Sequence, residues 1–171
     1  MTRRMEHTLA FAAPAAQIHA LFVSEDYWRS LAGFYRRLDP GTELTEFRAA
    51  GGGADVALRQ VLPRADLPQI ARKVIPVDMV ITRRQHFAAY DAEKHWATGT
   101  FEATMPRAPG RLRGDYELSD TGTGCSFRVR SSCKVSIPLI GGTLEDLVLT
   151  NMRIMFNAER DFTAGRLSAR G

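Results

Sequence analysis

Histidine and cysteine are the residues that most often bind metals or act as nucleophiles, so their spacing is the first indication of chemistry. The four histidines, His7, His19, His86 and His95, fall on separate predicted elements. No H-E-x-x-H or C-x-x-C spacing places two ligands on one helix or turn. His86 and His95 approach each other across a predicted hairpin, but a zinc site needs further ligands. The sequence therefore predicts no metal site and no cofactor.

Cys125 and Cys133 are the only cysteines, and both fall on one predicted strand, eight positions apart. At ~3.3 Å per residue they are separated by about 26 Å, which is too far for a disulfide. Reduced thiols are typical of the cytoplasm, which is the location we expect. Neither cysteine begins a helix, and no G-x-S-x-G nucleophile elbow is present. The sequence specifies no covalent catalyst.

Three polar residues are the defensible candidates for a catalytic role. His7 and Tyr116 lie on predicted strands, and Asn151 lies on a predicted helix. An enzyme would need at least two such groups to converge in a pocket, with one of them titrating near neutrality. The glycine-rich segments at 51–53 and 141–142 lack the lysine of a phosphate-binding loop, and they are better explained as a hairpin turn and a helix entry.

The charge balance is basic, with a formal net charge of +4 and a pI of about 9.4. Most of the 23 basic residues are arginines, and they are scattered along the chain with acids between them. Nucleic-acid binding would favour a run of cations interleaved with aromatic residues, so we predict no nucleic-acid partner. No apolar run approaches the ~18–20 residues of a membrane span. Polar residues interrupt the apolar stretch after Arg4, which argues against a secretory signal.

Strands dominate the elements that must position these side chains. Alternating apolar and polar residues predict a strand at about 4–12 and a series of antiparallel strands between about 43 and 137, joined by short turns. Two short helices follow the first strand, at about 14–33. This order is typical of the α+β class, and one domain over residues 1–171 accounts for it.

After residue 138 the apolar period changes from 2 to 3.6, which predicts a long helix at about 143–166. Thr143 and Asp146 have the spacing of a helix cap. The predicted apolar stripe comprises Leu144, Leu147, Val148, Ile154, Met155, Ala158 and Phe162. Asn151 falls near the middle of this stripe, so we expect its amide to be buried and to face either a strand or a cavity.

The segment entering this helix, I-P-L-I-G-G-T-L-E at 137–145, resembles the same segment of an uncharacterised actinobacterial family in the START-like superfamily, also called SRPBCC. That superfamily includes the birch-pollen allergen and polyketide cyclases. The resemblance covers almost the whole chain, and it implies a helix-grip fold. In that fold a curved antiparallel sheet of about seven strands surrounds the long helix. The chain departs from the family pattern at Phe87, where tryptophan is usual, and at Cys125, where threonine is preferred.

The resemblance also implies an apolar cavity between sheet and helix, because a helix gripped by a curved sheet tends to leave space there. We therefore expect a non-catalytic protein that binds or carries a hydrophobic small molecule such as a lipid, a sterol-like compound or a quinone. The alternatives are a cyclase- or dehydratase-type enzyme acting on a hydrophobic substrate, a protein-interaction module, and a solid core without a cavity. The candidate lining residues are His7, Leu9, Phe11, Phe101, Leu112, Tyr116, Phe127, Val129, Leu147, Asn151 and Met155.

Overall fold

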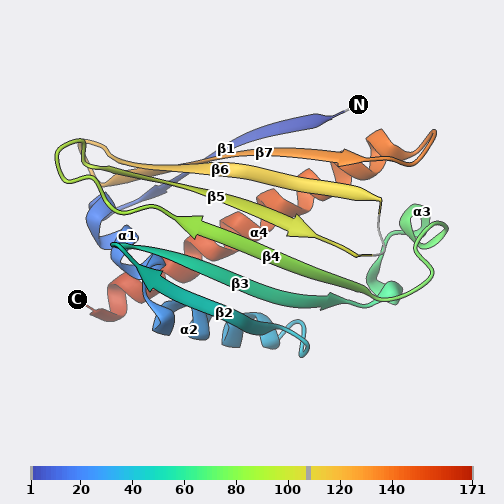
Figure 1. Cartoon of the computed structure of the whole chain (residues 1–171), viewed down its shortest axis with the longest axis horizontal. Helices are drawn as coiled ribbons and strands as arrows, with labels where there is room; N and C mark the ends of the chain where they lie inside the picture. The colour runs from blue at the N-terminus through green and yellow to red at the C-terminus, as the bar shows by residue number, and fades with distance from the viewer. Residues whose placement is uncertain (1, 107–108, 171) are drawn as a thin grey trace.

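The computed structural model describes residues 2–106 and 109–170, and these form one curved antiparallel sheet of seven strands (Figure 1). The strand order is β1-β7-β6-β5-β4-β3-β2, so the first strand pairs with the last. The α+β helix-grip fold expected from the sequence is confirmed. The strands are β1 (Arg3–Phe11), β2 (Glu43–Ala50), β3 (Gly53–Leu62), β4 (Met79–Phe87), β5 (Trp96–Thr104), β6 (Gly110–Asp120) and β7 (Cys125–Val135).

The strands form where one face is apolar and the connections are short. In β7 the odd-numbered residues from Cys125 to Cys133 are buried, while the even-numbered residues between them face outward. The β2–β3 hairpin closes through Gly51 and Gly52, whose φ angles are 60° and 83°. Residues other than glycine rarely adopt such angles in succession, which explains the glycine run at this turn.

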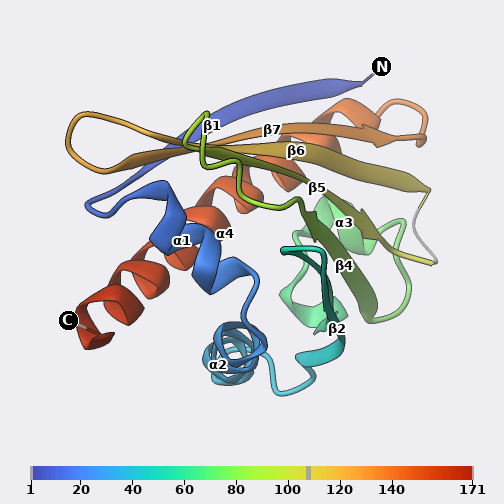
Figure 2. The same ribbon diagram turned by 60° about the vertical axis from the view of Figure 1, so that its left-hand side comes forward.

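The helices pack on one face of the sheet and at its ends. They are α1 (Ala15–Phe22), α2 (Glu25–Arg36), the short 3₁₀ turn η1 (Arg64–Asp66), α3 (Gln69–Arg72) and α4 (Gly141–Arg170). Figure 2 shows α4 running beneath the sheet, with α1 and α2 beside its C-terminal half. The β3–β4 connection that carries η1 and α3 lies at the opposite end of the molecule (Figures 1 and 2).

Helix α4 differs from its sequence-based prediction in both its start and its rotation. It begins at Gly141, so Thr143 lies inside the first turn and is not the N-cap. Asn151 is exposed, which shows that the predicted phase is wrong. Ile154 also faces solvent. The residues that the helix actually buries are Leu144, Glu145, Leu149, Met152, Phe156 and Thr163.

The inner face of the sheet, α1, α2 and α4 enclose an aromatic core. A second, smaller apolar cluster lies at the α3 end, where Leu67, Ala71 and Leu144 pack together. This cluster attaches the β3–β4 connection to the start of α4. No helix within residues 2–106 and 109–170 is both long and apolar enough to cross a bilayer.

Candidate functional site

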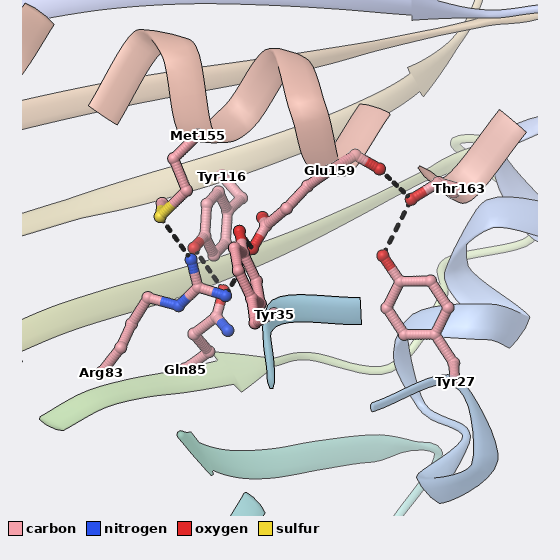
Figure 3. Close-up of polar contacts among 8 residues, drawn as sticks. All are labelled: Tyr27, Tyr35, Arg83, Gln85, Tyr116, Met155, Glu159 and Thr163. Atoms are coloured by element: carbon pink, nitrogen blue, oxygen red, sulfur yellow. Dashed lines mark hydrogen bonds and ion pairs between the residues drawn. The ribbon is translucent and has the colours of Figure 1, made fainter. Parts of the chain in front are cut away.

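A cluster of mostly buried side chains, joined by polar contacts, lies between the sheet and α4 (Figure 3). We call it the buried polar cluster. Strand β4 contributes two of its members, β6 one, α2 two and α4 three. The members are Tyr27, Tyr35, Arg83, Gln85, Tyr116, Met155, Glu159 and Thr163.

Period-2 alternation explains why β4 brings polar groups into the core. Its inward positions are the odd-numbered ones, where Ile81 and Phe87 flank Arg83 and Gln85. Arg83 and Gln85 are only 3% and 5% exposed. Burying a charge or an amide in such surroundings is costly unless a partner compensates, so the partners of these two residues are informative.

Arg83 forms a buried ion pair with Glu159 of α4. The distance from Nη2 to Oε1 is 2.6 Å, and the two side chains are 4% and 12% exposed. Arg83 Nη1 also lies 3.0 Å from Met155 Sδ. Tyr35 of α2 donates its hydroxyl hydrogen to Glu159 Oε1 at 2.8 Å. One carboxylate therefore joins strand β4, helix α2 and helix α4.

The electrostatics of the cluster keep Arg83 charged and the three tyrosines neutral. Burial is the largest single influence on the pKa of Arg83 and lowers it, but the surrounding groups, led by Glu159, together outweigh burial and leave the pKa above its usual value. Burial raises the pKa of Tyr116 well above normal, and burial together with the charge of Glu159 raises the pKa of both Tyr27 and Tyr35. The tyrosines are therefore neutral and available as hydrogen-bond donors.

Tyr116 and Gln85 form the second polar pair, in which one polar atom of Gln85 has no hydrogen-bond partner. The Tyr116 hydroxyl donates to Gln85 Oε1 at 2.6 Å. Gln85 Nε2 and Arg83 Nε are buried and have no hydrogen-bond partner among the described residues. If the amide is turned over, Nε2 meets the tyrosine and the oxygen becomes the unpartnered atom. In either orientation one polar atom of Gln85 stays unpaired at this position.

A third polar contact ties α2 to α4 at the edge of the cluster. The hydroxyls of Tyr27 and Thr163 are 2.8 Å apart, and Thr163 also donates to the carbonyl of Glu159 at 2.7 Å. Together with the Tyr35–Glu159 bond, this contact fixes the spacing of the two helices on the side of the molecule where Gln85 is buried.

A small cavity of about 20 Å³ lies beside Gln85. That volume accommodates about one water molecule. Its walls are mostly aromatic, and Tyr116 stacks between Phe87 and Phe127 with ring centroids 5.6 and 5.1 Å away. The lining comprises Leu9, Phe11, Phe22, Tyr27, Trp28, Gln85, Phe87, Tyr116, Phe127, Phe156, Glu159, Arg160 and Thr163.

Four of the eleven residues predicted from the sequence line this cavity: Leu9, Phe11, Tyr116 and Phe127. Three others, Phe101, Leu112 and Val129, are buried in the same core but do not border the cavity. The remaining four lie elsewhere.

Met155 is half-buried against Arg83, and Leu147 packs with the apolar cluster at the α3 end. His7 is only half-buried, and its Nε2 lies 2.9 Å from Asn157 Oδ1 on the side of α4. Asn151 faces solvent, so its predicted place at a cavity wall is wrong. Of the three polar residues considered for catalysis, only Tyr116 reaches the cavity.

Sequence reasoning missed Arg83, Gln85 and Glu159, although a signal for two of them is present. The inward face of β4 is continuous from Met79 to Phe87, and positions 83 and 85 fall on it by alternation alone. No sequence signal indicates Glu159, because apolar residues set the predicted phase of the helix, whereas α4 buries several polar residues.

Histidines and acids do not gather into a metal site in the part of the chain that the structure describes. His86 Nδ1 contacts Asp55 Oδ1 at 2.7 Å on the outer face of the sheet. His95 lies 3.7 Å from Asp120 at a strand end, so the two histidines considered together above have separate acidic neighbours.

Comparison with solved structures identifies the fold. The norcoclaurine synthase of Thalictrum flavum superposes with a TM-score of 0.56 at 18% identity, covering 98% of this chain and 87% of that one. Ara h 8.0201 gives a TM-score of 0.58 at 11% identity, covering 96% and 99% of the two chains. TTHA0849 from Thermus thermophilus gives 0.57 at 16% identity, with 100% and 99% coverage. Identities this low show a common fold alone.

Comparison with curated sequences finds relatives in actinobacteria. Uncharacterised proteins of Mycobacterium tuberculosis and Mycobacterium bovis are each 25% identical over 171 residues, covering 95% of this chain and 95% of theirs. The model of the family described as "Protein of unknown function (DUF2505)" matches residues 6–167. Because that match spans nearly all strands and helices of the fold, the chain belongs to the DUF2505 family.

Proposed function

We propose that this protein binds a hydrophobic small molecule between the inner face of the sheet and α4 and releases it unchanged. The observation that carries the proposal is that Gln85 lines an aromatic-walled cavity and has an unpartnered amide atom. A few convergent polar groups in apolar surroundings are typical of small-molecule sites. Leu9, Phe11, Tyr116 and Phe127 are the predicted lining residues that we assign to this site.

Uptake of a ligand requires the cavity to enlarge, because about 20 Å³ holds no more than a water-sized group. The contacts of Tyr27 with Thr163 and of Tyr35 with Glu159 join α2 to α4. Separating these two helices is the change that exposes Gln85 to an entering molecule. The fold also supports the proposal, since a norcoclaurine synthase structure with dopamine and hydroxybenzaldehyde has a TM-score of 0.54 to this chain.

We favour binding over catalysis on the chemistry of the cluster. Tyr27, Tyr35 and Tyr116 have pKa values raised away from neutrality by burial, so none of them exchanges a proton easily at physiological pH. The ligand classes that suit the site are lipids, sterol-like compounds and quinones, each with a large apolar body and few polar atoms. We place this activity in the cytoplasm, because Cys125 and Cys133 are both free thiols.

Trp28 provides a direct readout, because it lines the cavity while the other tryptophan, Trp96, does not. In the Trp96→Phe variant, titration with palmitic acid, cholesterol and menadione is expected to change Trp28 fluorescence saturably for at least one of the three. Native mass spectrometry should show a one-to-one complex with the same compound. Gln85→Leu should weaken binding of any ligand whose polar atom pairs with the amide by about five- to 150-fold.

The reference for this experiment is Asn151→Leu, which introduces the same side chain at an exposed position of α4. It should bind like the parent protein. Absence of both a fluorescence change and a copurifying apolar compound in organic extracts would overturn the proposal. Turnover of the bound compound into a new product would replace it with the enzymatic alternative.

A further inference from the structure

We infer that the end of the molecule carrying the β7–α4 connection docks on membranes containing anionic phospholipid. The inference does not depend on the proposed cavity. It rests on a cluster of four exposed cations on the outer face of the sheet, which we call the basic end patch. Its members are Arg4 of β1, Arg111 and Arg113 of β6, and Lys134 of β7.

Strand register places these cations side by side. Arg111 is directly opposite Lys134, and Ser132 is flanked by Arg4 on one side and Arg113 on the other. Like charges directly opposite each other on neighbouring strands destabilise a sheet. The same arrangement creates a local positive electrostatic potential, which attracts anions.

On the same three strands, the outward cations beyond the basic end patch have acidic partners, which sets the patch apart. Two register positions further along, Arg130 pairs with Asp115 at 2.8 Å. Beyond it, Arg128 contacts Glu117 at 3.0 Å and Glu6 at 3.9 Å. Within residues 2–106 and 109–170, none of the four cations of the patch has an acid within 4.0 Å. The acid facing Arg113 in register, Glu102, belongs to β5 and forms no such pair.

An exposed apolar tip stands beside the patch. Leu139 follows Lys134 by five residues, is fully exposed and has a φ of 70°. Leucine rarely adopts this backbone conformation, and here the conformation holds an apolar side chain out in solvent. Most exposed leucines need no explanation, but this one combines backbone strain with full exposure five residues after a cation of the patch.

The tip and the patch are physically joined. The amide of Ser136 donates to the carbonyl of Pro109 at 2.7 Å, which holds the β7–α4 connection against the start of β6. Between them lies an open groove of about 300 Å³, and its walls include Arg111 and Lys134. A phosphate group in this groove would meet both cations at once.

The β3–β4 connection adds a second tip at the same end (Figures 1 and 2). It presents the exposed pair Lys73 and Val74, and the cluster around Leu67, Ala71 and Leu144 packs it against the start of α4. Alternating cationic and apolar groups at one end match the two layers of a bilayer surface, anionic head groups above acyl chains. A nucleic acid would match the cations but would leave both apolar tips without a partner.

The test is cosedimentation with vesicles of phosphatidylcholine alone and of phosphatidylcholine mixed with phosphatidylglycerol. The protein should bind only the mixed vesicles, and added salt should weaken the binding. Arg111→Gln with Lys134→Gln should lower the partition coefficient by about 25-fold, at roughly fivefold per cation. This double variant should melt no lower than the parent protein, because it removes a like-charge pair. Leu139→Ser should also weaken binding.

Matched controls separate docking from general effects of charge and hydrophobicity. Arg37→Gln with Arg153→Gln removes two exposed cations elsewhere, and Leu38→Ser removes another exposed leucine, which is 79% exposed. Both should bind mixed vesicles like the parent protein. Equal binding to both kinds of vesicle, or equal losses in the controls, would overturn the inference. Binding to duplex DNA that depends on Arg111 and Lys134 but not on Leu139, without vesicle binding, would assign the patch to a nucleic acid instead.

Discussion

Gln85 and Tyr116 illustrate how single polar residues behave inside an aromatic core. The tyrosine hydroxyl has one partner, Gln85 Oε1, and the amide has one atom left over. A buried donor that loses its acceptor costs about 1–3 kcal/mol, whereas replacing both partners by apolar groups of similar shape is nearly neutral. The pair therefore allows its polar contact to be measured separately from its packing.

Gln85→Leu is expected to lower the free energy of unfolding by about 1–3 kcal/mol, because it leaves the buried Tyr116 hydroxyl without a hydrogen-bond acceptor. Adding Tyr116→Phe should recover most of that loss. Urea denaturation of the parent, the two single variants and the double variant measures both effects. If the Gln85→Leu variant is as stable as the parent, the hydroxyl has another acceptor and the pairing described here is wrong.

Elements were predictable from the sequence to different degrees. The antiparallel strand region was predictable because period-2 alternation fixes the phase of a strand and turn residues fix its ends, as in β7 and at the Gly51–Gly52 turn. Helix α4 was found, but its rotation was wrong, because its buried face includes Glu145 and Thr163. A polarity pattern assigns such residues to the exposed face of a helix. The predicted buried face of α4 was therefore rotated toward Asn151. Three members of the candidate site were missed for the same reason: Arg83, Gln85 and Glu159 are polar residues on inward faces.

The corrected phase of α4 predicts opposite outcomes at adjacent positions. Met152→Ala should lower the free energy of unfolding by about 2–5 kcal/mol, because it empties a buried site. Asn151→Ala should change it by less than about 0.5 kcal/mol, as is usual at exposed positions. Thermal or chemical denaturation of the two variants measures the difference. If Asn151→Ala destabilises the protein more than Met152→Ala does, the helix phase predicted from the sequence is correct.

At the scale of the whole molecule, the buried polar cluster makes folding sensitive to alkaline pH. Three of the four tyrosines are buried between the sheet, α2 and α4, and burial raises their pKa values above the ordinary value of 10.0. In the unfolded chain these tyrosines ionise near pH 10, whereas in the folded protein they retain their protons. Their contribution to stability is therefore complete below that pH and is lost as the pH rises above it.

The free energy of unfolding should thus fall by up to about 4 kcal/mol per pH unit above pH 10, at about 1.4 kcal/mol for each of three tyrosines. Absorbance of tyrosinate near 295 nm should show the three buried groups ionising together with unfolding. The fourth, Tyr90, is only partly buried and serves as an internal reference, since it should ionise before the others. Stepwise ionisation of all four in folded protein would contradict the burial described here.

The pairing of β1 with β7 also governs the order in which the molecule can assemble. Phe11 lies opposite Cys125, and Arg3 opposite Cys133, so the first strand gains its partner only after five other strands have been made. Closing so long a loop is entropically expensive, and contacts between distant segments slow folding. During synthesis the apolar faces of β1, α1 and α2 remain exposed to solvent until β7 and α4 emerge from the ribosome. The nascent chain should therefore depend on chaperones over most of its translation, and completion of α4 should be the step that releases it.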